Sequence, residues 1–330
     1  MLNKMKYEVF THTINNIKKQ VRKTTIKHTA LSLFLALGFT ASAQESTAPE
    51  DFDLPKNTFK AVISYADFTI PQQQFAIRPS HSTYTFQEGK IINYQYRDSS
   101  SMIRTDVDYH YENGQLKRKE TIESSRAGME YKTYKYRTEN EGYKTTFYKI
   151  YHTGEVDKTI AFYNDAGELR GKSVYNVHGQ RTKQIEYGGK EGYRIKKYHN
   201  GKVMSEITHS NNNDGKLTKT VTYVVPGEDD EVKVLTLYYY NQKGNPRQVV
   251  DFVTEKKNSR QKPTKTTYVN YLYDGDIWVA KIQYSTTTKT PGKIVATIRT
   301  IETPGKTYHA PRNEQLEAFC QETYQNYLKL

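Results

Sequence analysis

Tyr163-Asn-Asp-Ala-Gly167-Glu-Leu169 and Tyr175-Asn-Val-His-Gly179-Gln-Arg181 are two copies of one short unit. In each copy a tyrosine ends a run of strand-forming residues, a polar turn closes on glycine, and a second run begins. Degenerate copies of this unit fill most of the chain. Because consecutive strands joined by tight turns must be antiparallel, the unit predicts a meander of β-hairpins.

Turn dipeptides extend the pattern along the chain, at Asn113-Gly114, Asn200-Gly201, Asp214-Gly215 and Asp274-Gly275. Glycine takes a positive φ in such turns, and asparagine or aspartate tolerates one. Between the turns, side chains alternate as strands require, with Val221, Tyr223 and Val225 on one face. The spacing predicts about 15 to 18 short strands.

The expected fold is therefore all-β: a repetitive antiparallel β-hairpin meander over residues 58–310, in the form of an extended twisted sheet. Residues 44–57 are polar and acidic and contain two prolines, which predicts a flexible leader. Leu316, Phe319 and Cys320 begin an apolar stripe at helical spacing, so residues 311–330 are predicted to form a C-terminal helix packed on an end or edge of the sheet. Closure of the sheet depends on strand stagger, which the sequence does not display.

The first 43 residues have the layout of a bacterial secretory signal peptide. A basic region that includes Lys18 and Lys27 precedes an uncharged run from Ala30 to Thr40, and Ala41-Ser42-Ala43 places small residues before a cut at Gln44. The run is short for a membrane anchor, since a spanning helix needs about 20 apolar residues. We expect export to the periplasm, the cell surface or the medium.

Charge and composition narrow the possible partners. Removal of residues 1–43 takes away seven basic residues and one acidic residue, which lowers the formal net charge from +13 to +7. The remaining charges of both signs are interspersed, so nucleic acid is not an expected partner. No later apolar run is long enough for a helical membrane span. Cys320 is the single cysteine, so no internal disulfide can form.

The short motifs resemble two families of β-hairpin repeats. Tyr111-Glu-Asn-Gly-Gln-Leu116 and Tyr198-His-Asn-Gly-Lys-Val203 resemble MORN-variant repeats. Tyr163 to Leu169 and Tyr240-Asn-Gln-Lys-Gly-Asn245 resemble YD repeats of the Rhs type. The resemblance covers residues 84–285 in fragments. It implies consecutive hairpins, and it supplies no catalytic residue.

Catalytic, cofactor and metal sites are not expected, so the chain is interpreted as a non-enzyme. Cys320 lies on the apolar stripe and is interpreted as a buried structural thiol. His152, His178 and His199 occupy equivalent places before turn glycines, but without the close spacing of zinc motifs. Ser210 to Gly215 fails the calcium-loop pattern, and Glu228 to Glu231 reads as a solvated acidic turn. Asp274 and Asp276 flank a turn glycine, which explains them without catalysis.

A tyrosine- and lysine-rich surface is the remaining candidate site. Tyrosine offers a large ring with a polar hydroxyl, and all but one of the 29 tyrosines follow residue 43. Such a face could stack sugar rings or hold acidic polymers, although lysine stems also simply cover tyrosine rings across strands. The candidate binding residues are Tyr193, Lys196, Lys197, Tyr198, Tyr238, Tyr239 and Tyr240.

Two functional hypotheses follow from these observations. The first is an exported, non-enzymatic repeat protein of the cell envelope or exterior that acts as a binding or scaffold module for an envelope polysaccharide or a protein. The alternative is a closed or folded-over β-barrel that carries a small lipid or glycan ligand. An outer-membrane barrel is disfavoured, because lysine and threonine interrupt the faces that lipid requires to be apolar.

Overall fold

The computed structural model describes residues 47–69, 74–125, 127–213, 215–224, 232–254, 263–285 and 293–329. The predicted signal peptide, residues 1–43, and the predicted acidic turn at residues 228–231 lie outside these ranges. The described chain consists of short 3-10 helices, a long series of strands and a C-terminal α-helix. Its elements are η1 (Pro49–Phe52), β1 (Lys60–Thr69), β2 (Gln74–Gln87), β3 (Lys90–Arg97), β4 (Ile103–Glu112), β5 (Gln115–Ser125), β6 (Gly128–Glu141), β7 (Lys144–Tyr151), β8 (Val156–Tyr163), β9 (Leu169–Tyr175), β10 (Arg181–Tyr187), η2 (Gly189–Glu191), β11 (Gly192–His199), β12 (Lys202–Asn211), β13 (Leu217–Val224), β14 (Val232–Tyr240), β15 (Pro246–Thr254), β16 (Pro263–Asp274), β17 (Ile277–Ser285), β18 (Lys293–Thr303), β19 (Lys306–Tyr308) and α2 (Asn313–Leu328).

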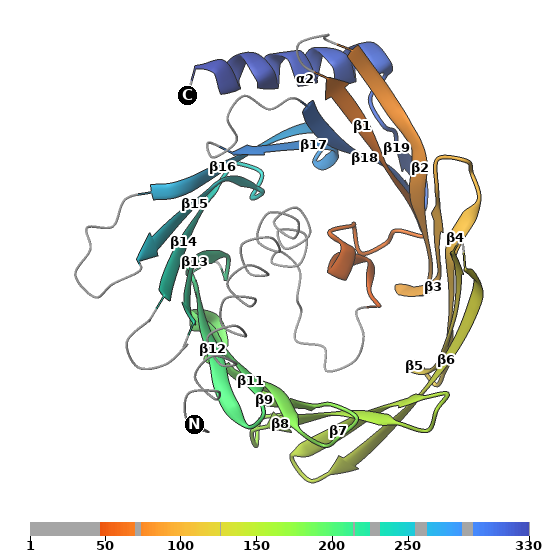
Figure 1. The fold of residues 1–330 in the computed structure, drawn as a ribbon, viewed down its shortest axis with the longest axis vertical. Coiled ribbons are helices and arrows are strands. Elements are labelled where there is room, and N and C mark those ends of the chain that lie inside the picture. Colours follow the sequence, from red (N-terminus) through yellow and green to blue (C-terminus); the bar gives the residue numbers. More distant parts are fainter. Residues whose placement is uncertain are drawn as a thin grey trace, which may run out of the picture.

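The strands form one antiparallel sheet in which each strand pairs with the next along the chain. The sheet also pairs β1 with β18, from Lys60 opposite Glu302 to Thr69 opposite Lys293. This last ladder closes β1 to β18 into an 18-strand barrel, and the strands form a ring in the end view of Figure 1. The all-β hairpin meander with one C-terminal helix is confirmed, and the extended sheet is corrected to a closed one.

A turn built on asparagine explains the repeated unit. In the turns that begin at Asn164, Asn176, Asn212 and Asn241, the glycine three residues later donates its N–H to the asparagine carbonyl oxygen. The asparagine Oδ1 accepts the N–H of the fourth residue after it, at 2.8 to 3.0 Å. The glycine φ values lie between 70° and 79°, in the left-handed region. The pattern Asn-x-x-Gly therefore encodes a hairpin turn in its side-chain chemistry.

Recurring β-bulges give a physical reason for closure. The ladders slip by one residue next to the turns, for example at Phe86, Tyr111, Tyr198 and Tyr273. Each bulge bends its strand and increases the local twist. Strongly twisted open sheets rarely exceed about 10 strands without curling. A long meander with repeated bulges therefore curls until its first and last strands can pair.

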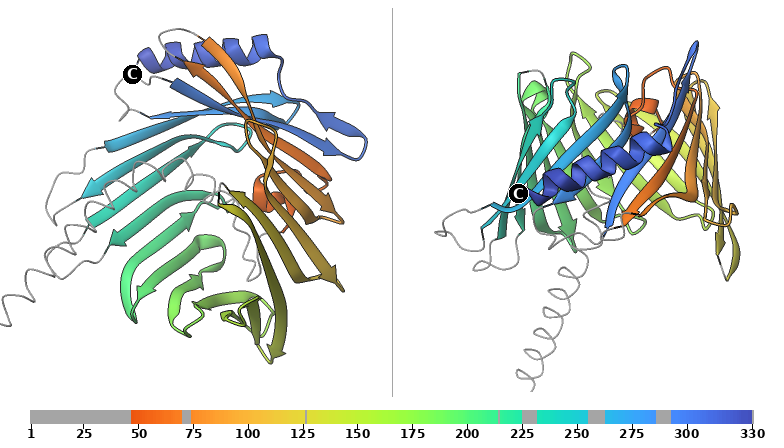
Figure 2. Two further views of the ribbon diagram at one scale, coloured as in Figure 1. Left: turned by 45° about the vertical axis from the view of Figure 1, so that its right-hand side comes forward. Right: turned by 90° about the horizontal axis from the view of Figure 1, so that it is seen from above.

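The C-terminal helix packs on the outside of the barrel, as Figure 2 shows. Leu316, Phe319 and Cys320 of α2 contact a cluster on the outer face of β1, β17 and β18 that includes Phe68 and Ile282. In the structure, α2 thus packs on the sheet that it was predicted to contact. The helix covers a face and not an edge, because ring closure pairs β1 with β18.

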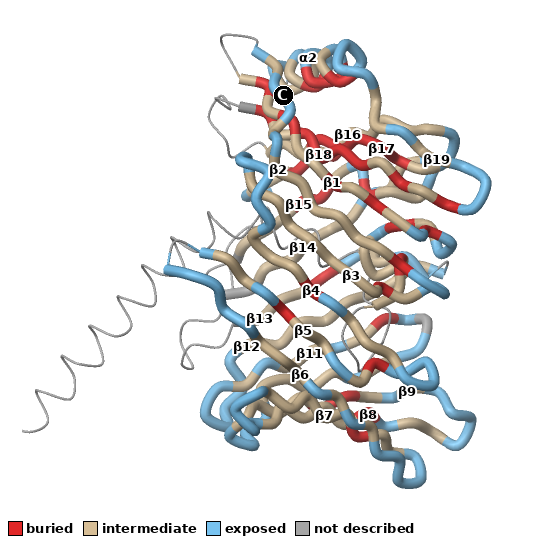
Figure 3. The backbone as a smooth tube through the Cα atoms, turned by 90° about the vertical axis from the view of Figure 1, so that its right-hand side faces the viewer, coloured by how far each residue is buried: buried red, intermediate tan, exposed pale blue. Residues whose placement is uncertain are grey.

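Many of the fully buried side chains lie near this helix, as the buried residues in Figure 3 show. Phe68, Ile298 and Leu316 are at most 2% exposed. Much of the remaining ring consists of half-buried side chains. This distribution is consistent with a barrel of this strand number, since about 16 to 18 strands enclose a space too wide for side chains to fill.

The described part of the predicted flexible leader has defined contacts, so that prediction needs correction. Residues 47–58, named here the inner strap, pass inside the ring, where Figure 1 shows η1. Leu54 is 4% exposed and packs with Ala61, Phe86 and Ile301. The Thr47 carbonyl oxygen accepts the Ile91 N–H at 2.7 Å. The segment is polar overall, but its few apolar side chains are the ones that pack against the barrel wall.

Candidate functional site

Two fixed points determine which side chains face the barrel interior. The inner strap contacts Tyr84 and Phe86 from inside, whereas α2 contacts Phe68 from outside. Residues paired across an antiparallel ladder share a face, and successive residues alternate. The register therefore extends the assignment around the ring in both directions. The two directions agree at Lys172, which pairs with Ala161 on one side and Ile185 on the other and faces inward.

The inner strap is held by a cation–aromatic cluster. The Trp278 indole N–H donates to Asp53 Oδ2 at 2.9 Å. Arg299 Nε donates to the Trp278 carbonyl oxygen at 2.6 Å, and its Nη1 donates to the Asp53 carbonyl oxygen. The Arg299 guanidinium lies 3.3 Å from the Trp278 ring centroid, and the Lys281 Nζ lies 4.7 Å from it. These contacts tie the strap to β17 and β18.

The two cations in this cluster are strongly buried, whereas the Asp53 side chain is 46% exposed. Burial lowers the pKa of Arg299 to about 10, and Asp53 opposes that shift. Burial likewise lowers the pKa of Lys281 to about 8, again with Asp53 acting in the opposite direction. Asp53 is therefore the carboxylate that compensates two buried cations. The cluster is occupied by the chain's own strap, so its role is structural.

Tyrosine dominates the inner face of the barrel. The register turns the following tyrosines inward: Tyr65, Tyr84, Tyr94, Tyr96, Tyr109, Tyr134, Tyr136, Tyr151, Tyr187, Tyr193, Tyr238 and Tyr271. Many keep part of their surface accessible, Tyr193 and Tyr238 among them. A row of amphipathic rings therefore faces the interior, where each ring can stack and each hydroxyl can form hydrogen bonds.

Most inward cations have a partner in this inner face. Two lysines lie over the Tyr134 ring: Lys149 Nζ is 4.4 Å from its centroid, and Lys119 Nζ is 5.1 Å from it. Arg78 forms an ion pair with Asp67 at 2.8 Å, and Lys132 contacts Glu123 at 2.9 Å. Over this part of the barrel, inward cations therefore lie over tyrosine rings or form ion pairs with acids.

The inner face of β9 to β12 is the candidate site, because lysines and aromatic rings lie together there; Lys172 Nζ lies 5.9 Å from the Tyr187 ring centroid. Lys172, Lys183 and Lys197, named here the basic wall, face the interior on three successive strands. Lys183 and Lys197 pair directly across the β10–β11 ladder. Lys172 is 4% exposed, Lys183 is half-buried and Lys197 is exposed. Burial, then Lys197, lowers the pKa of Lys183, and burial, then Lys183, lowers that of Lys172 to about 8.

An aromatic row borders the basic wall. The ring centroids of Tyr187 and Tyr193 are 6.1 Å apart, and Tyr193 stacks on His209 at 4.3 Å. Gly192 makes this stacking possible, because a Cβ at its φ of 127° would lie 2.0 Å from the His209 carbonyl oxygen. The His209 Nδ1 lies 3.0 Å from the Thr220 hydroxyl. The wall thus combines cations with flat rings on one continuous surface.

Because His209 is partly buried, the stability of the folded protein should depend on pH below neutrality. Burial, then Lys183, lowers its pKa from 6.5 to about 4 in the folded protein. The unfolded chain therefore binds more protons between these values, so the free energy of unfolding should fall as the pH drops from about 6.5 to about 4. Urea unfolding across this range should show a smaller fall for His209→Gln. The exposed-turn variant His178→Gln is the control, and a His209→Gln variant with the wild-type slope would contradict the prediction.

The structure divides the predicted binding residues between two faces. Tyr193, Lys197, Tyr238 and Tyr240 face inward, by the register of β11 and β14. The outward residues are Lys196, Tyr198 and Tyr239. The predicted surface placed consecutive residues such as Lys196 and Lys197 together, but successive residues of a strand point to opposite faces of the sheet. The inward members join Lys172, Lys183, Tyr187 and His209, which the sequence analysis did not select.

The other sequence candidates form no reactive cluster. Among the described residues, no three metal-ligating side chains come together. Cys320 is buried, and burial, then Glu317, raises its pKa to about 12, so the thiol is protonated. Asp274 and Asp276 pair with Lys306 and Lys243 at 3.4 and 3.0 Å. These are turn contacts on the surface.

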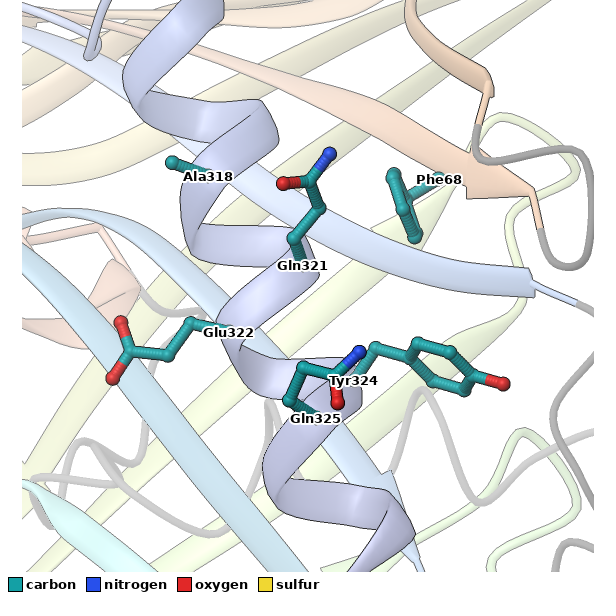
Figure 4. Close-up of a pocket in the computed structure, with 6 residues that line it drawn as sticks. All are labelled: Phe68, Ala318, Gln321, Glu322, Tyr324 and Gln325. Carbon is teal, nitrogen blue, oxygen red and sulfur yellow. The ribbon is translucent and has the colours of Figure 1, made fainter.

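Two clefts flank α2 on the outside. The smaller, about 260 Å³, is lined by Phe68, Tyr324 and four further helix residues and is shown in Figure 4. The larger, about 820 Å³, lies between α2 and the β16–β17 turn and includes His309 and Arg312. The charged residues that line the larger cleft are Asp274, Arg312 and Glu322, and Asp274 is paired with Lys306. Within the described ranges, no helix is long and apolar enough to cross a bilayer.

Comparison with known proteins adds little. No family model matches the chain, and no curated protein matches it. Among solved structures, a porin-like protein from Bacteroides uniformis ATCC 8492 is similar at a TM-score of 0.37, with 11% identity over 78% of this chain and 98% of that one. A porin-like protein from Bacteroides vulgatus ATCC 8482 is similar at 0.26, with 10% identity over 74% and 98%. Similarity at this level gives no information about what this chain binds.

Proposed function

We propose that this protein is an exported, non-enzymatic binding barrel that works in water and holds a glycan against its inner face. The observation that carries the proposal is the tyrosine-lined interior with accessible rings at Tyr187, Tyr193 and Tyr238. Aromatic rings stack on the apolar faces of sugars, and their hydroxyls bond to sugar hydroxyls. The lysine, threonine and aspartate side chains between the rings favour a glycan over a lipid.

The charged outer face of the barrel favours a location in water and not in a lipid bilayer. Outward positions of β4 to β13 carry many charges, among them Asp108, Glu120, Lys135, Lys158 and Glu206. A lipid-facing band must be apolar, and each lysine or arginine at the bilayer midplane costs about 2 to 4 kcal/mol. The purified protein should therefore remain soluble without detergent. Export itself rests on the predicted signal peptide, and the partner polymer is expected in the envelope.

The test is calorimetric titration of the purified protein with oligosaccharides, both neutral and acidic, at least three sugars long. Tyr193→Ala should weaken binding by about 3- to 10-fold, since one aromatic contact contributes roughly 0.5 to 1.5 kcal/mol. The matched control is Tyr198→Ala on the outward face of the same strand, which should bind like wild type. Absence of binding by every oligosaccharide, or equal losses in the two variants, would refute the proposal.

A further inference from the structure

We propose that Lys183 and Lys197, together with Lys172, form a site on the inner face of the barrel that binds an anionic group of the ligand, such as a carboxylate, sulfate or phosphate. This inference rests on the proposed function, because it states which class of glycan the interior selects, namely an acidic one. These lysines lie on three neighbouring strands and face the same side of the β9–β10–β11 ladders.

The direct pairing of two lysines is the first observation. Lys183 and Lys197 are opposite each other in the β10–β11 ladder and face the same side. Directly opposed side chains have Cβ atoms about 4.5 to 5.5 Å apart, and like charges at such positions are destabilising. Lys172 adds a third positive charge on the neighbouring strand and repels Lys183. The chain thus maintains a repulsive arrangement at this point of its inner face.

On the outer face of the same strands, by contrast, cations lie next to acids. Lys196 pairs with Glu206 across the β11–β12 ladder and lies 3.8 Å from Glu186 on β10. Arg194 lies 3.3 Å from Glu206. On this outer face, Arg194 and Lys196 therefore each have an acid nearby, and Arg181 lies over the Tyr198 ring at 4.3 Å. The lysine pair inside is a local feature of the inner face, and the strands as a whole do not lack acidic residues.

No acid on the inner face of these strands compensates the pair. The ladder residues that share the inner face with Lys183 on the described β10 to β13 are Ile185, Tyr187, Tyr193, Ile195, Lys197, Ser205, Ile207, His209, Thr220 and Thr222. The inward acids on strands to either side have other partners: Asp157 on β8 accepts a hydrogen bond from the Tyr151 hydroxyl, and Asp251 on β15 accepts one from Thr236 at 2.7 Å. His209 carries no charge at neutral pH, because its pKa is lowered to about 4.

Packing alone does not require these charges. The lysine stems lie next to the apolar row of Ile185 and Ile195, which a neutral side chain of similar length would also cover. Elsewhere inside the barrel, Lys132 is matched by Glu123, and Lys149 lies over Tyr134. The three lysines share one face with the Tyr187–Tyr193–His209 row, which provides what an acidic sugar needs: a ring to stack on and cations for its acid group.

Thermal unfolding with inorganic sulfate as the probe tests the site independently of any sugar. In sodium chloride, Lys183→Gln should raise the melting temperature by about 1 to 2 °C because it removes repulsion. Lys196→Gln on the outward face should not raise it, since that change removes an attraction. Replacing chloride by sulfate at equal ionic strength should stabilise the wild type more than Lys183→Gln. Equal sulfate effects, or a fall in melting temperature for Lys183→Gln, would overturn the inference.

Titration with trigalacturonate and its methyl ester separates the inference from the proposed function. The ester keeps the sugar backbone but replaces each carboxylate by a neutral methyl ester, and wild type should bind the acid about ten-fold more tightly. The double variant Lys183→Gln/Lys197→Gln should bind both with the affinity that wild type has for the ester. Equal binding of both sugars by all variants would overturn the anion site and leave the glycan function standing. A sulfate effect without binding of any oligosaccharide would refute the glycan function and support the anion site.

Discussion

Replacement of Phe68 by alanine is expected to lower the free energy of unfolding by about 3 to 5 kcal/mol. Phe68 is 1% exposed and packs between the outer face of the barrel and α2, in one cluster with Leu316 and Phe319. Alanine would leave a cavity in the region where complete burial is concentrated. The loss includes the transfer energy of the ring and the contacts that its neighbours no longer make.

Urea unfolding measures this loss, and Cys320 shows where it acts. Cys320 is the single cysteine, is fully buried and belongs to the same cluster. Its reaction with a maleimide in native buffer should therefore be faster in Phe68→Ala than in wild type. Phe162→Ala is the matched control, because Phe162 faces outward on β8 and is 42% exposed. Equal destabilisation by the two variants would show that α2 is not docked through Phe68.

Replacement of Arg299 by alanine is expected to lower the free energy of unfolding by about 2 to 4 kcal/mol, because two carbonyl oxygens lose a buried, charged donor. Arg299 is 3% exposed and donates to the carbonyl oxygens of Trp278 and Asp53. Its removal leaves both acceptors without this donor, uncovers one face of the Trp278 ring and takes a buried cation away from Asp53. The inner strap should then detach from β17 and β18.

Trp278 is the only tryptophan of the chain, so its fluorescence reports on this cluster alone. Arg299→Ala should shift the emission maximum to longer wavelength in native buffer, as water reaches the indole, and should lower the urea midpoint. The control is Arg137→Ala, which removes a guanidinium 4.5 Å from the Tyr148 ring centroid on the outer face. That exposed contact should contribute less than about 1 kcal/mol. An unchanged emission spectrum in Arg299→Ala would contradict the strap contacts.

The candidate site shows where sequence reasoning reaches its limit. Strand alternation could have separated Lys196 from Lys197 and Tyr239 from Tyr238, because the period of two is a local property of each strand. Which alternate set faces inward could not be known before the ring was closed. Lys172, Lys183 and Lys197 are spread over 26 positions of sequence, and only the register of two ladders places them together. The irregular Gly188–Gly192 turn hides that register, since it is not one of the regular two-residue turns.

The sequence by itself determined the hairpins and the helix. The turns of Asn164, Asn176 and Asn241 and the apolar stripe of Leu316, Phe319 and Cys320 depend on residues within a few positions of one another. Only the tertiary structure decided that the sheet closes, that residues 47–58 pack inside it and that three lysines share the inner face. Closure requires β1 to pair with β18 more than 200 residues away, and such pairing follows from twist and bulges summed over the whole ring. Local side-chain chemistry specifies each turn, but the accumulated curvature of many strands determines what faces the interior.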